Sequence, residues 1–345
     1  MKLKHTLTCI IVIALHISCS DQNNIIISKP QETIQGVVVS EFAHRPIREV
    51  EIDFKGIGVK TDTAGFFKID IPESRIDLAT DQISFMCFPY VSRKIKIDQL
   101  LTKSIADTVT MQLSVKWTMY QKILAAGIEQ SYNIIPVIDW YRNNETLKNS
   151  KVIIMRHDVD MDAQAAKAMA YIENQMDIRS TYYFRWRTAD IDQISYVREL
   201  GHEVGLHYET LASYCAEHHI TESTAITPEI IRTCREILKS EIRLFEQKYG
   251  DINSICSHGA PQNRLLNVAN SILVYEENLS DYYVEIDTND PRFLKNTAID
   301  IFIADSGSQW QPIPLIAAIQ QNYHTILALV HPDWWGDMVI SSTDG

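Results

Sequence analysis

The sequence predicts an α/β protein preceded by a small all-β domain. Residues 30–114 alternate β-branched and aromatic residues with polar ones between Gly, Asp and Pro, a pattern typical of short antiparallel strands. From residue 115 onward, strand-like runs alternate with segments of helical spacing. That order predicts a mainly parallel sheet, open or closed into a barrel. The chain has 345 residues, which is enough for both domains.

The first residues have the composition of an export signal. Lys2 and Lys4 precede an apolar run over residues 7–17. The run is too short to span a membrane as a mature helix, but it has the length of a secretory signal. Cys19 follows in a context that resembles a bacterial lipobox, with His16 standing where Leu is usual.

We therefore expect an exported lipoprotein of the cell envelope, periplasmic or on the outer surface, held to the membrane by a lipid on Cys19. Simple cleavage of the signal is the alternative. The signal peptide is expected over residues 1–18 and a tether over residues 19–29. Export permits disulfides. The later cysteines have no paired or metal-binding spacing, which favours free thiols, and one bridge among the last three stays open.

The charge of the chain argues against nucleic acid as a partner. The net charge is −12, and no cluster of Lys and Arg is present. Phosphate binding depends on such clusters.

The first domain is expected over residues 30–114 as a small antiparallel β-sandwich. Gly65 lies where a tight turn needs a positive φ angle. The segment resembles the carboxypeptidase regulatory-like domain, and the matching residues are "GVV" at 36–38, Pro46, Val50, "TDTAGFFKIDIP" at 61–72 and the later "FPY". The resemblance implies a spacer or docking module without chemistry of its own.

The second domain is expected over residues 115–345. Helical spacing marks "WTMYQKILAAGIEQ", "DAQAAKAMAYIENQM", "DIDQISYVRELG" and "TPEIIRTCREILKSEIRLFEQKYG". Strand-like runs are "KVIIMRHD", "STYYFRWR", "HEVGLHYE", "SICSHG", "DYYVEID", "AIDIFIADSG" and "HTILALVH". In such folds the chemistry collects at the carboxyl ends of the strands.

The stretch "MRHDVDMD" ends one of these strands with concentrated charge. Val152–Met155 has the apolar composition of a strand buried on both faces. Asp158 and Asp160 follow two residues apart, so both carboxylates point the same way and His157 points the other way. Two adjacent carboxylates repel unless a cation or a shared proton lies between them. A metal with one carboxylate as ligand and the other as base satisfies both, and a solvated loop in which Asp160 or Asp162 caps the next helix is the alternative.

Four other strand ends also carry groups that bind metals or transfer protons. A single histidine is usually structural, but five such strand ends together are hard to explain by packing. The residues are His202, His207 and Glu209 in "GHEVGLHYET", His258 in "SHGAP", Asp305 in "DSGSQW" and His331 in "LVHPDWW".

The order of these motifs resembles the polysaccharide deacetylase family, the NodB-homology group of carbohydrate esterase family 4. The likeness runs from about residue 120 to the end and is closest to a divergent branch. That branch carries "RHDVD", "STYYFR" and "GHEVGLHYE", which stand here at 156–160, 180–185 and 201–209. The resemblance implies a distorted (β/α) barrel that removes N- or O-acetyl groups from carbohydrate with one divalent metal ion, usually zinc.

Carried over residue by residue, the resemblance implies an acid–base pair. Asp158 would be the general base and Asp160 a metal ligand, although Val159 between them leaves their order open. His331 matches the general acid of the family. Asp305 could orient and stabilise it, as acids do for catalytic histidines.

The metal-binding motif is incomplete in this sequence. His207 matches the first histidine of the pair that binds the metal in the family. The second histidine would follow four residues later, where Leu211 stands. Catalytic zinc usually has three protein ligands. From the two-residue period of a strand, Glu209 is the first candidate for the third ligand and His202 is the second.

The expected substrate pocket also departs from the family. Trp310 and Trp335 could form the walls of an acetyl pocket. "SHGAP" stands where the family has an Arg-containing motif, so the Arg that pairs with the catalytic aspartate is missing there. Arg156 and His258 are the candidates for its role.

Three functions agree with this sequence. The first is a metal-dependent hydrolase that removes acetyl groups from a cell-surface or extracellular polysaccharide. Leu211 and the missing Arg motivate the second, a deacetylase-like protein that binds glycan without turnover. The third is a metal-dependent hydrolase of C–N bonds in non-sugar substrates.

Overall fold

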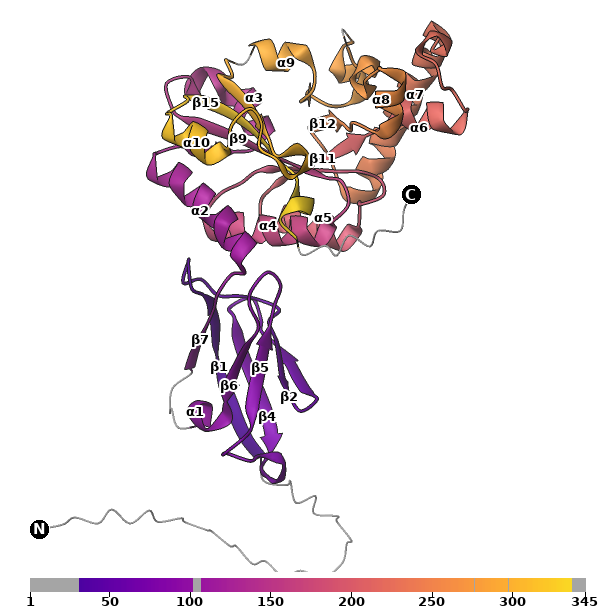
Figure 1. Ribbon diagram of the computed structural model, residues 1–345. Helices are drawn as coiled ribbons and strands as arrows, with labels where there is room; N and C mark the ends of the chain where they lie inside the picture. Colours follow the sequence, from indigo (N-terminus) through magenta and orange to yellow (C-terminus); the bar gives the residue numbers. More distant parts are fainter. Residues whose placement is uncertain (1–30, 102–106, 276, 297, 337–345) are drawn as a thin grey trace, which may run out of the picture.

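The computed structural model describes residues 31–101, 107–275, 277–296 and 298–336. Two small sheets form the N-terminal part, and a larger α/β domain follows (Figure 1). The expected signal peptide, the tether and Cys19 lie outside the described residues. Among the helices that are described, none has both the length and the hydrophobicity that crossing a membrane requires.

The N-terminal part consists of short strands and one short helix. Their bounds are β1 Gln31–Ser40, β2 Glu51–Phe54, β3 Ile57–Lys60, β4 Phe66–Pro72, β5 Gln82–Met86, β6 Arg93–Lys96, α1 Ile97–Leu101 and β7 Asp107–Met111. One sheet has the order β4-β1-β7 and the other the order β3-β2-β5-β6. Both sheets contribute to a single cluster of buried hydrophobic residues, because alternate residues of β1, β4 and β5 point inward.

The expectation of a purely antiparallel N-terminal domain is wrong for one pair of strands. β1 pairs with β7 in parallel, while β1–β4, β2–β3, β2–β5 and β5–β6 are antiparallel. β6 and β7 lie in different sheets, so the chain changes sheets between these two strands, and β7 can then run parallel to β1. The expected turn at Gly65 is confirmed, since its φ is +69° and a Cβ atom there would lie 2.6 Å from the carbonyl oxygen of Val38.

The C-terminal domain alternates strands and helices, as expected from residue 115 onward. The strands are β8 Asn133–Ile135, β9 Val152–Val159, β10 Thr181–Phe184, β11 Glu203–Tyr208, β12 Ser254–Ser257, β13 Ile286–Asp287, β14 Ile301–Ala304 and β15 Thr325–Val330. The helices are α2 Val115–Glu129, α3 Val137–Leu147, α4 Ala163–Gln175, α5 Ile191–Glu199, α6 Thr210–Glu217, α7 Pro228–Tyr249, α8 Pro261–Leu266, α9 Pro291–Asn296 and α10 Leu315–Gln320.

The strands of this domain form one parallel sheet that is curved but open. Its order is β13-β12-β11-β10-β9-β15-β14, and β8 pairs with the first half of β9. Within the described residues, β13 and β14 stay at the two edges and do not pair, so the expected barrel does not close. The stretch "DYYVEID" was expected to be a longer strand, but it begins inside the 3₁₀ turn Leu279–Tyr282 and contributes only the two-residue strand β13.

The N-terminal part packs against the outer faces of α4 and α5. Arg45 donates to the carbonyl oxygen of Asn174 at 3.1 Å and pairs with Asp177 at 2.5 Å. Tyr171 donates to the carbonyl oxygen of Pro46 at 3.2 Å. These bonds connect the two parts, and Tyr171 of α4 also packs into the hydrophobic cluster of the N-terminal part.

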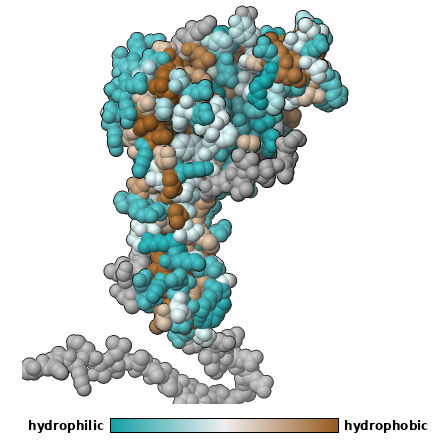
Figure 2. All heavy atoms as spheres, viewed as in Figure 1, coloured by the Kyte–Doolittle hydropathy of each residue, from teal (hydrophilic) through white to brown (hydrophobic). Residues whose placement is uncertain are grey.

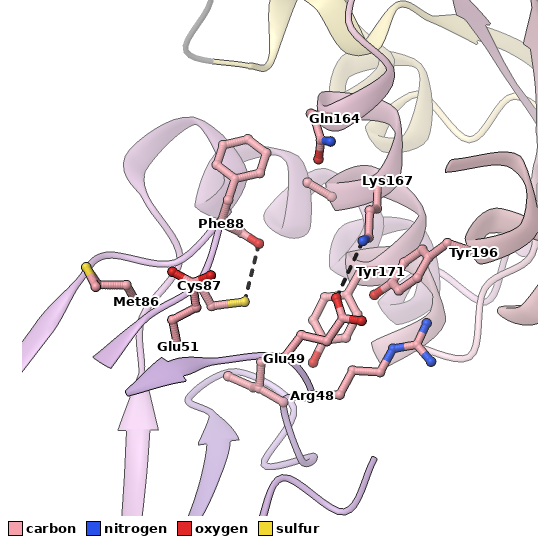
Figure 3. A pocket seen from close by; sticks show the side chains of 12 residues that line it. Arg48, Glu49, Glu51, Met86, Cys87, Phe88, Gln164, Lys167, Tyr171 and Tyr196 are labelled. Carbon is pink, nitrogen blue, oxygen red and sulfur yellow. Dashed lines mark hydrogen bonds and ion pairs between the residues drawn. The ribbon is translucent and has the colours of Figure 1, made fainter. Parts of the chain in front are cut away.

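A cavity of about 360 Å³ remains at this junction (Figure 3). Arg48 and Lys167 both lie over the ring of Tyr196, at 4.2 and 4.3 Å from its centroid. Lys167 also pairs with Glu49 at 3.5 Å. In the view of Figure 2, hydrophilic side chains dominate the surface of the small sheets, and hydrophobic side chains gather on the C-terminal domain.

One glycine in the parallel sheet lies where no side chain would fit. A Cβ atom at Gly205 in β11 would lie 2.5 Å from the ring of Tyr183 and 2.4 Å from the carbonyl oxygen of Ser254. The Tyr183 hydroxyl is bonded to Ser254 Oγ at 2.7 Å, so the ring cannot easily move away. We expect Gly205→Ala to lower the free energy of unfolding by about 1–3 kcal/mol, measured by urea titration. The control is Gly259→Ala, where nothing lies within 4 Å of the added Cβ, and a change within about 0.5 kcal/mol is expected.

Candidate metal centre and acid–base site

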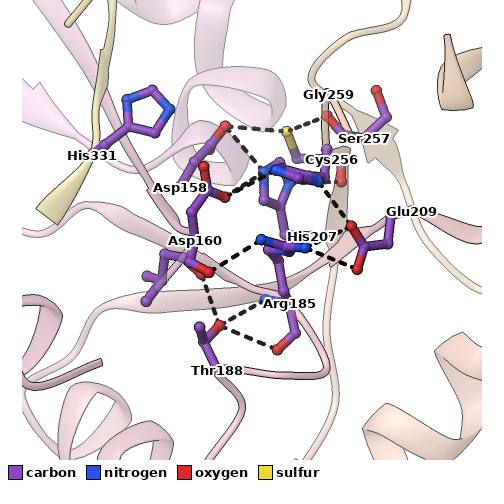
Figure 4. Close-up of polar contacts among 12 residues, drawn as sticks. Asp158, Asp160, Arg185, Thr188, His207, Glu209, Cys256, Ser257, Gly259 and His331 are labelled. Carbon is purple, nitrogen blue, oxygen red and sulfur yellow. Dashed lines mark hydrogen bonds and ion pairs between the residues drawn. The ribbon is translucent and has the colours of Figure 1, made fainter. Parts of the chain in front are cut away.

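Charged side chains from four strands meet at the carboxyl edge of the sheet (Figure 4). Asp158 is in β9, and Asp160 follows the end of that strand. His207 is in β11, His258 follows β12, and His331 follows β15. Parallel pairing brings the carboxyl ends of these strands to one edge, which is where ligands bind in such sheets.

The local structure of β9 positions both aspartates. All eight residues of β9 are buried, because the strand lies inside the sheet between β15 and β10. Asp162 then caps α4 by accepting from the Ala165 amide at 2.9 Å. Asp333 accepts from the Met161 and Asp162 amides at 3.1 and 2.6 Å. The short loop that carries Asp160 is therefore held at both ends.

Asp160, His207 and His258 form one candidate metal-ligand group. Asp160 Oδ1 lies 3.4 Å from His207 Nε2 and 3.6 Å from His258 Nε2. The three ligand atoms lie within 4.8 Å of one another. Asp160 Oδ1 is buried and accepts no hydrogen bond from the residues that the structure describes. One carboxylate and two imidazoles are a donor set that suits zinc and other divalent transition metals.

The carboxylates around His207 also favour a positive charge at this group. Burial opposes protonation, but the Asp158 carboxylate, with further help from Asp160, raises the pKa of His207 well above its ordinary value. Burial likewise raises the pKa of Asp160, while the neighbouring His207 imidazole lowers it, and the net shift is downward. Two ionised carboxylates beside one imidazole favour a positive charge between them.

Glu209, the expected third ligand, instead contacts the ring nitrogen of His258 that is turned away from Asp160. Its carboxylate accepts from Arg185 Nη2 at 3.0 and 2.8 Å and from His258 Nδ1 at 2.9 Å. Burial raises the pKa of Glu209, but the hydrogen bonds from His258 and Arg185 lower it to about 2. A carboxylate that orients a ligating histidine is a common outer partner in metal sites. The geometry therefore supports His258 as the ligand and Glu209 as the residue that positions it.

His202, the second candidate for a ligand, lies away from this group. It precedes β11, whereas His207 is near the carboxyl end of that strand, so roughly 15 Å of extended chain separates them. His202 Nε2 donates to the carbonyl oxygen of Ala170 at 2.9 Å, and Nδ1 accepts from the Ser180 amide at 3.2 Å. Burial lowers the pKa of His202. Both ring nitrogens are used, so the expectation that His202 could bind the metal is wrong.

Arg156 places its guanidinium beside Asp158. Its Nη2 donates to Asp158 Oδ2 at 3.0 Å, and its Nη1 donates to Thr288 at 2.6 Å and to Asn289 at 3.2 Å. Burial raises the pKa of Asp158, but Arg156 and His207 lower it to about 2, so the carboxylate is ionised at neutral pH. Asp158 Oδ1 is buried and has no hydrogen-bond partner among the described residues, which leaves one oxygen free to accept a proton.

His331 and Asp305 form a hydrogen-bonded pair at the end of β15. The Nδ1–H of His331 donates to Asp305 Oδ1 at 2.7 Å, and the His331 amide donates to the same oxygen at 2.9 Å. Asp305 Oδ2 accepts from the Trp335 indole at 3.2 Å. Burial lowers the pKa of His331, but Asp305 and then Asp158 raise it, and the net shift is upward. The arrangement favours a protonated imidazole whose Nε2 is the outer nitrogen.

The two tryptophans take part in packing. Trp335 belongs to the main hydrophobic core, and its ring lies 5.1 Å from that of Tyr120. Trp310 is partly buried against the same core. The structure thus places Trp335 next to Asp305, and an acetyl pocket with Trp310 and Trp335 as its walls stays a prediction.

The role of His258 could have been found from one signal in the sequence. "CSH" places Cys256 and His258 two residues apart, so their side chains share one side of an extended chain. In the structure His207 lies opposite Cys256 in the parallel pair of β11 and β12. The pairing of the strands was the missing information.

Comparison of the sequence with protein-family models gives no match. A search of the curated proteins gives no match either.

Substituting His258 tests whether this residue is the third metal ligand. We expect His258→Ala to weaken zinc binding by more than about 100-fold, and Glu209→Gln by about 10–100-fold, because a ligand costs more than its outer partner. Zinc affinity is measured by competition with a chromophoric chelator. His218→Ala, at an exposed histidine after α6, is the control and should bind zinc like the wild type. Equal affinities of His258→Ala and wild type would contradict the assignment.

Proposed function

We propose that the protein is a metal-dependent hydrolase that removes acetyl groups from a cell-surface or extracellular polysaccharide. The observation that carries the proposal is the meeting of a three-ligand group, an ionised carboxylate and a carboxylate-bound imidazole at one edge of the sheet. Hydrolysis of an amide or ester at neutral pH needs these three components. The parallel sheet supports the proposal, because ligands bind at the carboxyl edge of such sheets.

The chain's own residues have separate tasks in this reaction. Asp160, His207 and His258 would hold the divalent ion, which supplies Lewis acidity when bound. Asp158 accepts the proton of the attacking water at Oδ1, while Arg156 holds Oδ2 in place.

The acid lies at the end of the neighbouring strand. His331 donates a proton from Nε2 to the departing amine or alkoxide. Asp305 keeps the other ring nitrogen protonated and fixes the orientation of the ring.

The contacts favour turnover over glycan binding alone. A missing third ligand and a missing Arg were the reasons to consider an inactive protein. His258 and Arg156 occupy positions from which they can supply both functions. We further propose that the N-terminal part is a β-sandwich of the regulatory-like type that supports the hydrolase domain in the cell envelope, and that the lipid anchor at Cys19 holds both to the membrane.

The test is release of acetate from acetylated glycans by the purified protein. N-acetylated chitin oligomers, O-acetylated xylan and an N-acetylated amino acid are compared in parallel. We expect acetate from at least one glycan, loss of release after chelation, and recovery when zinc is added. Release from the amino acid alone would favour the hydrolase of non-sugar C–N bonds. Glycan binding without acetate from any substrate would contradict the proposal.

A further inference from the structure

We propose that His207 belongs to two overlapping ligand groups, and that a thiol-seeking cation such as Cd²⁺ binds the inner one. The inner group consists of Asp158, His207 and Cys256. Asp158 Oδ2 lies 3.5 Å from His207 Nε2 and 3.8 Å from Cys256 Sγ. The three ligand atoms lie within 4.8 Å of one another, and all three residues are buried. Contacts of this length between ligand atoms are close to those around a tetrahedral ion.

The pairing of the strands makes this group rigid. His207 and Cys256 are direct partners in the parallel ladder of β11 and β12, so their side chains leave the same face of the sheet. Asp158 reaches them from β9, which is held between two neighbouring strands. No loop has to move to bring the three ligand atoms together.

Outer contacts orient each ligand of the inner group. The Nδ1–H of His207 donates to the carbonyl oxygen of Cys256 at 3.0 Å, which leaves Nε2 as the ligating nitrogen. The side-chain amide of Asn289 donates to Cys256 Sγ at 3.6 Å. Arg156 fixes Asp158 at 3.0 Å. Hydrogen bonds of this kind hold ligands in place in metal sites, and an N–H group directed at sulfur stabilises a thiolate.

The two groups differ in chemical softness and share one residue. The outer group, Asp160 with His207 and His258, offers one oxygen and two nitrogens, whereas the inner group offers oxygen, nitrogen and sulfur. Soft cations prefer the thiolate, and its proton is released on binding. Because each group needs His207, one ion excludes the other.

Occupation of the inner group has a consequence for activity, and this part rests on the proposed function. An ion there engages Asp158, which then no longer serves as the base. Cd²⁺ is therefore expected to inhibit acetyl release even when zinc is supplied.

The test is a Cd²⁺ titration of the purified protein, followed by the ultraviolet charge-transfer absorption of the cadmium–thiolate bond. We expect the band in the wild type and in Cys87→Ser, a half-buried thiol of the N-terminal part. Cys256→Ser should lack the band and bind Cd²⁺ at least about tenfold more weakly, because a hydroxyl is a poor ligand for a soft ion. Serine is nearly isosteric with cysteine, and circular dichroism checks that the variant is folded.

The outcomes separate this inference from the proposed function. His258→Ala should keep the cadmium band, because the inner group does not use His258. A band in Cys256→Ser equal to that of the wild type, or no band in the wild type, would overturn the inference. A wild type that shows the band but releases no acetate would leave the inner group standing and remove the proposed function.

Discussion

Asp158→Asn is expected to lower kcat for acetyl release by about 10²–10⁴-fold, the range attributed to a positioned general base. The amide oxygen can still accept the hydrogen bond that Arg156 donates at 3.0 Å, so the fold should be preserved. What is lost is the second carboxylate oxygen, which is buried and unpartnered within the described part of the chain. Initial rates of acetate release at saturating substrate measure the effect.

Metal content distinguishes the loss of the base from the loss of a metal ligand. Metal analysis should find Asp158→Asn loaded like the wild type, whereas Asp160→Asn should lose most of its metal together with its activity. If Asp158→Asn kept a rate within threefold to fivefold of the wild type, another group would have to be the base. If both variants lost metal equally, the division of roles between the two aspartates would be wrong.

Glu173→Ala is expected to lower the free energy of unfolding by about 3–5 kcal/mol, because it removes one partner from a buried charged network. Glu173 in α4 is fully buried. Its carboxylate accepts from Tyr120 at 2.5 Å, His157 at 2.8 Å, Ser180 at 2.5 Å and Tyr182 at 2.7 Å. The Tyr120 and Tyr182 hydroxyls and the His157 Nε2–H would lose their acceptor inside the core, whereas Ser180 keeps its contact with His202 Nδ1 at 3.2 Å. Urea denaturation followed by circular dichroism measures the change.

Glu229→Gln is the matched control for this substitution. The Glu229 side chain is 72% exposed and forms an i,i+3 pair with Arg232 in α7. Exposed pairs of this kind contribute about 0–1 kcal/mol, so the midpoint of unfolding should barely move. A loss for Glu173→Ala no greater than that of the control would show that the network contributes little to stability.

The same glutamate predicts a pH dependence of stability. Burial raises the pKa of Glu173, but His157, His202 and Ser180 together lower it to about 2. Because the folded value lies below the unfolded value of about 4.3, the ionised carboxylate stabilises the protein above that pH. The contribution is lost as the pH falls toward 2. The difference in unfolding free energy between wild type and Glu173→Gln should therefore shrink between about pH 5 and pH 3, in repeated urea titrations.

The sequence was most informative where a strand pattern and a charge pattern met. The apolar run before "HDVD" correctly indicated a strand buried on both faces. Its two-residue period placed Asp158 and Asp160 on one side and His157 on the other, and the contacts agree. These results depend only on the geometry of a single extended chain, which is local.

The two-residue period of a strand gave a misleading direction for Glu209, because β11 has already ended there. β11 stops at Tyr208, and Glu209 has φ −137° and ψ 29° at the start of α6. The alternation therefore no longer holds at Glu209, and its carboxylate turns toward Arg185 and His258. The extent of the barrel was overestimated for a similar reason. "DYYVEID" has strand composition, but its first two residues end a 3₁₀ turn and only its last two form a strand, because tertiary packing overrides weak β propensity.

By itself the sequence determined the alternation of strands and helices from residue 115 onward, the acids and histidines at the strand ends, and the direction of the side chains within β9. These features follow from backbone periodicity, which acts over a few residues. Only the tertiary structure decided which strands are neighbours, and with them the position of His258 beside Asp160 and His207, the pairing of Arg156 with Asp158, and the open sheet. Those contacts join residues that are distant in the chain, and their positions depend on packing that no single segment encodes.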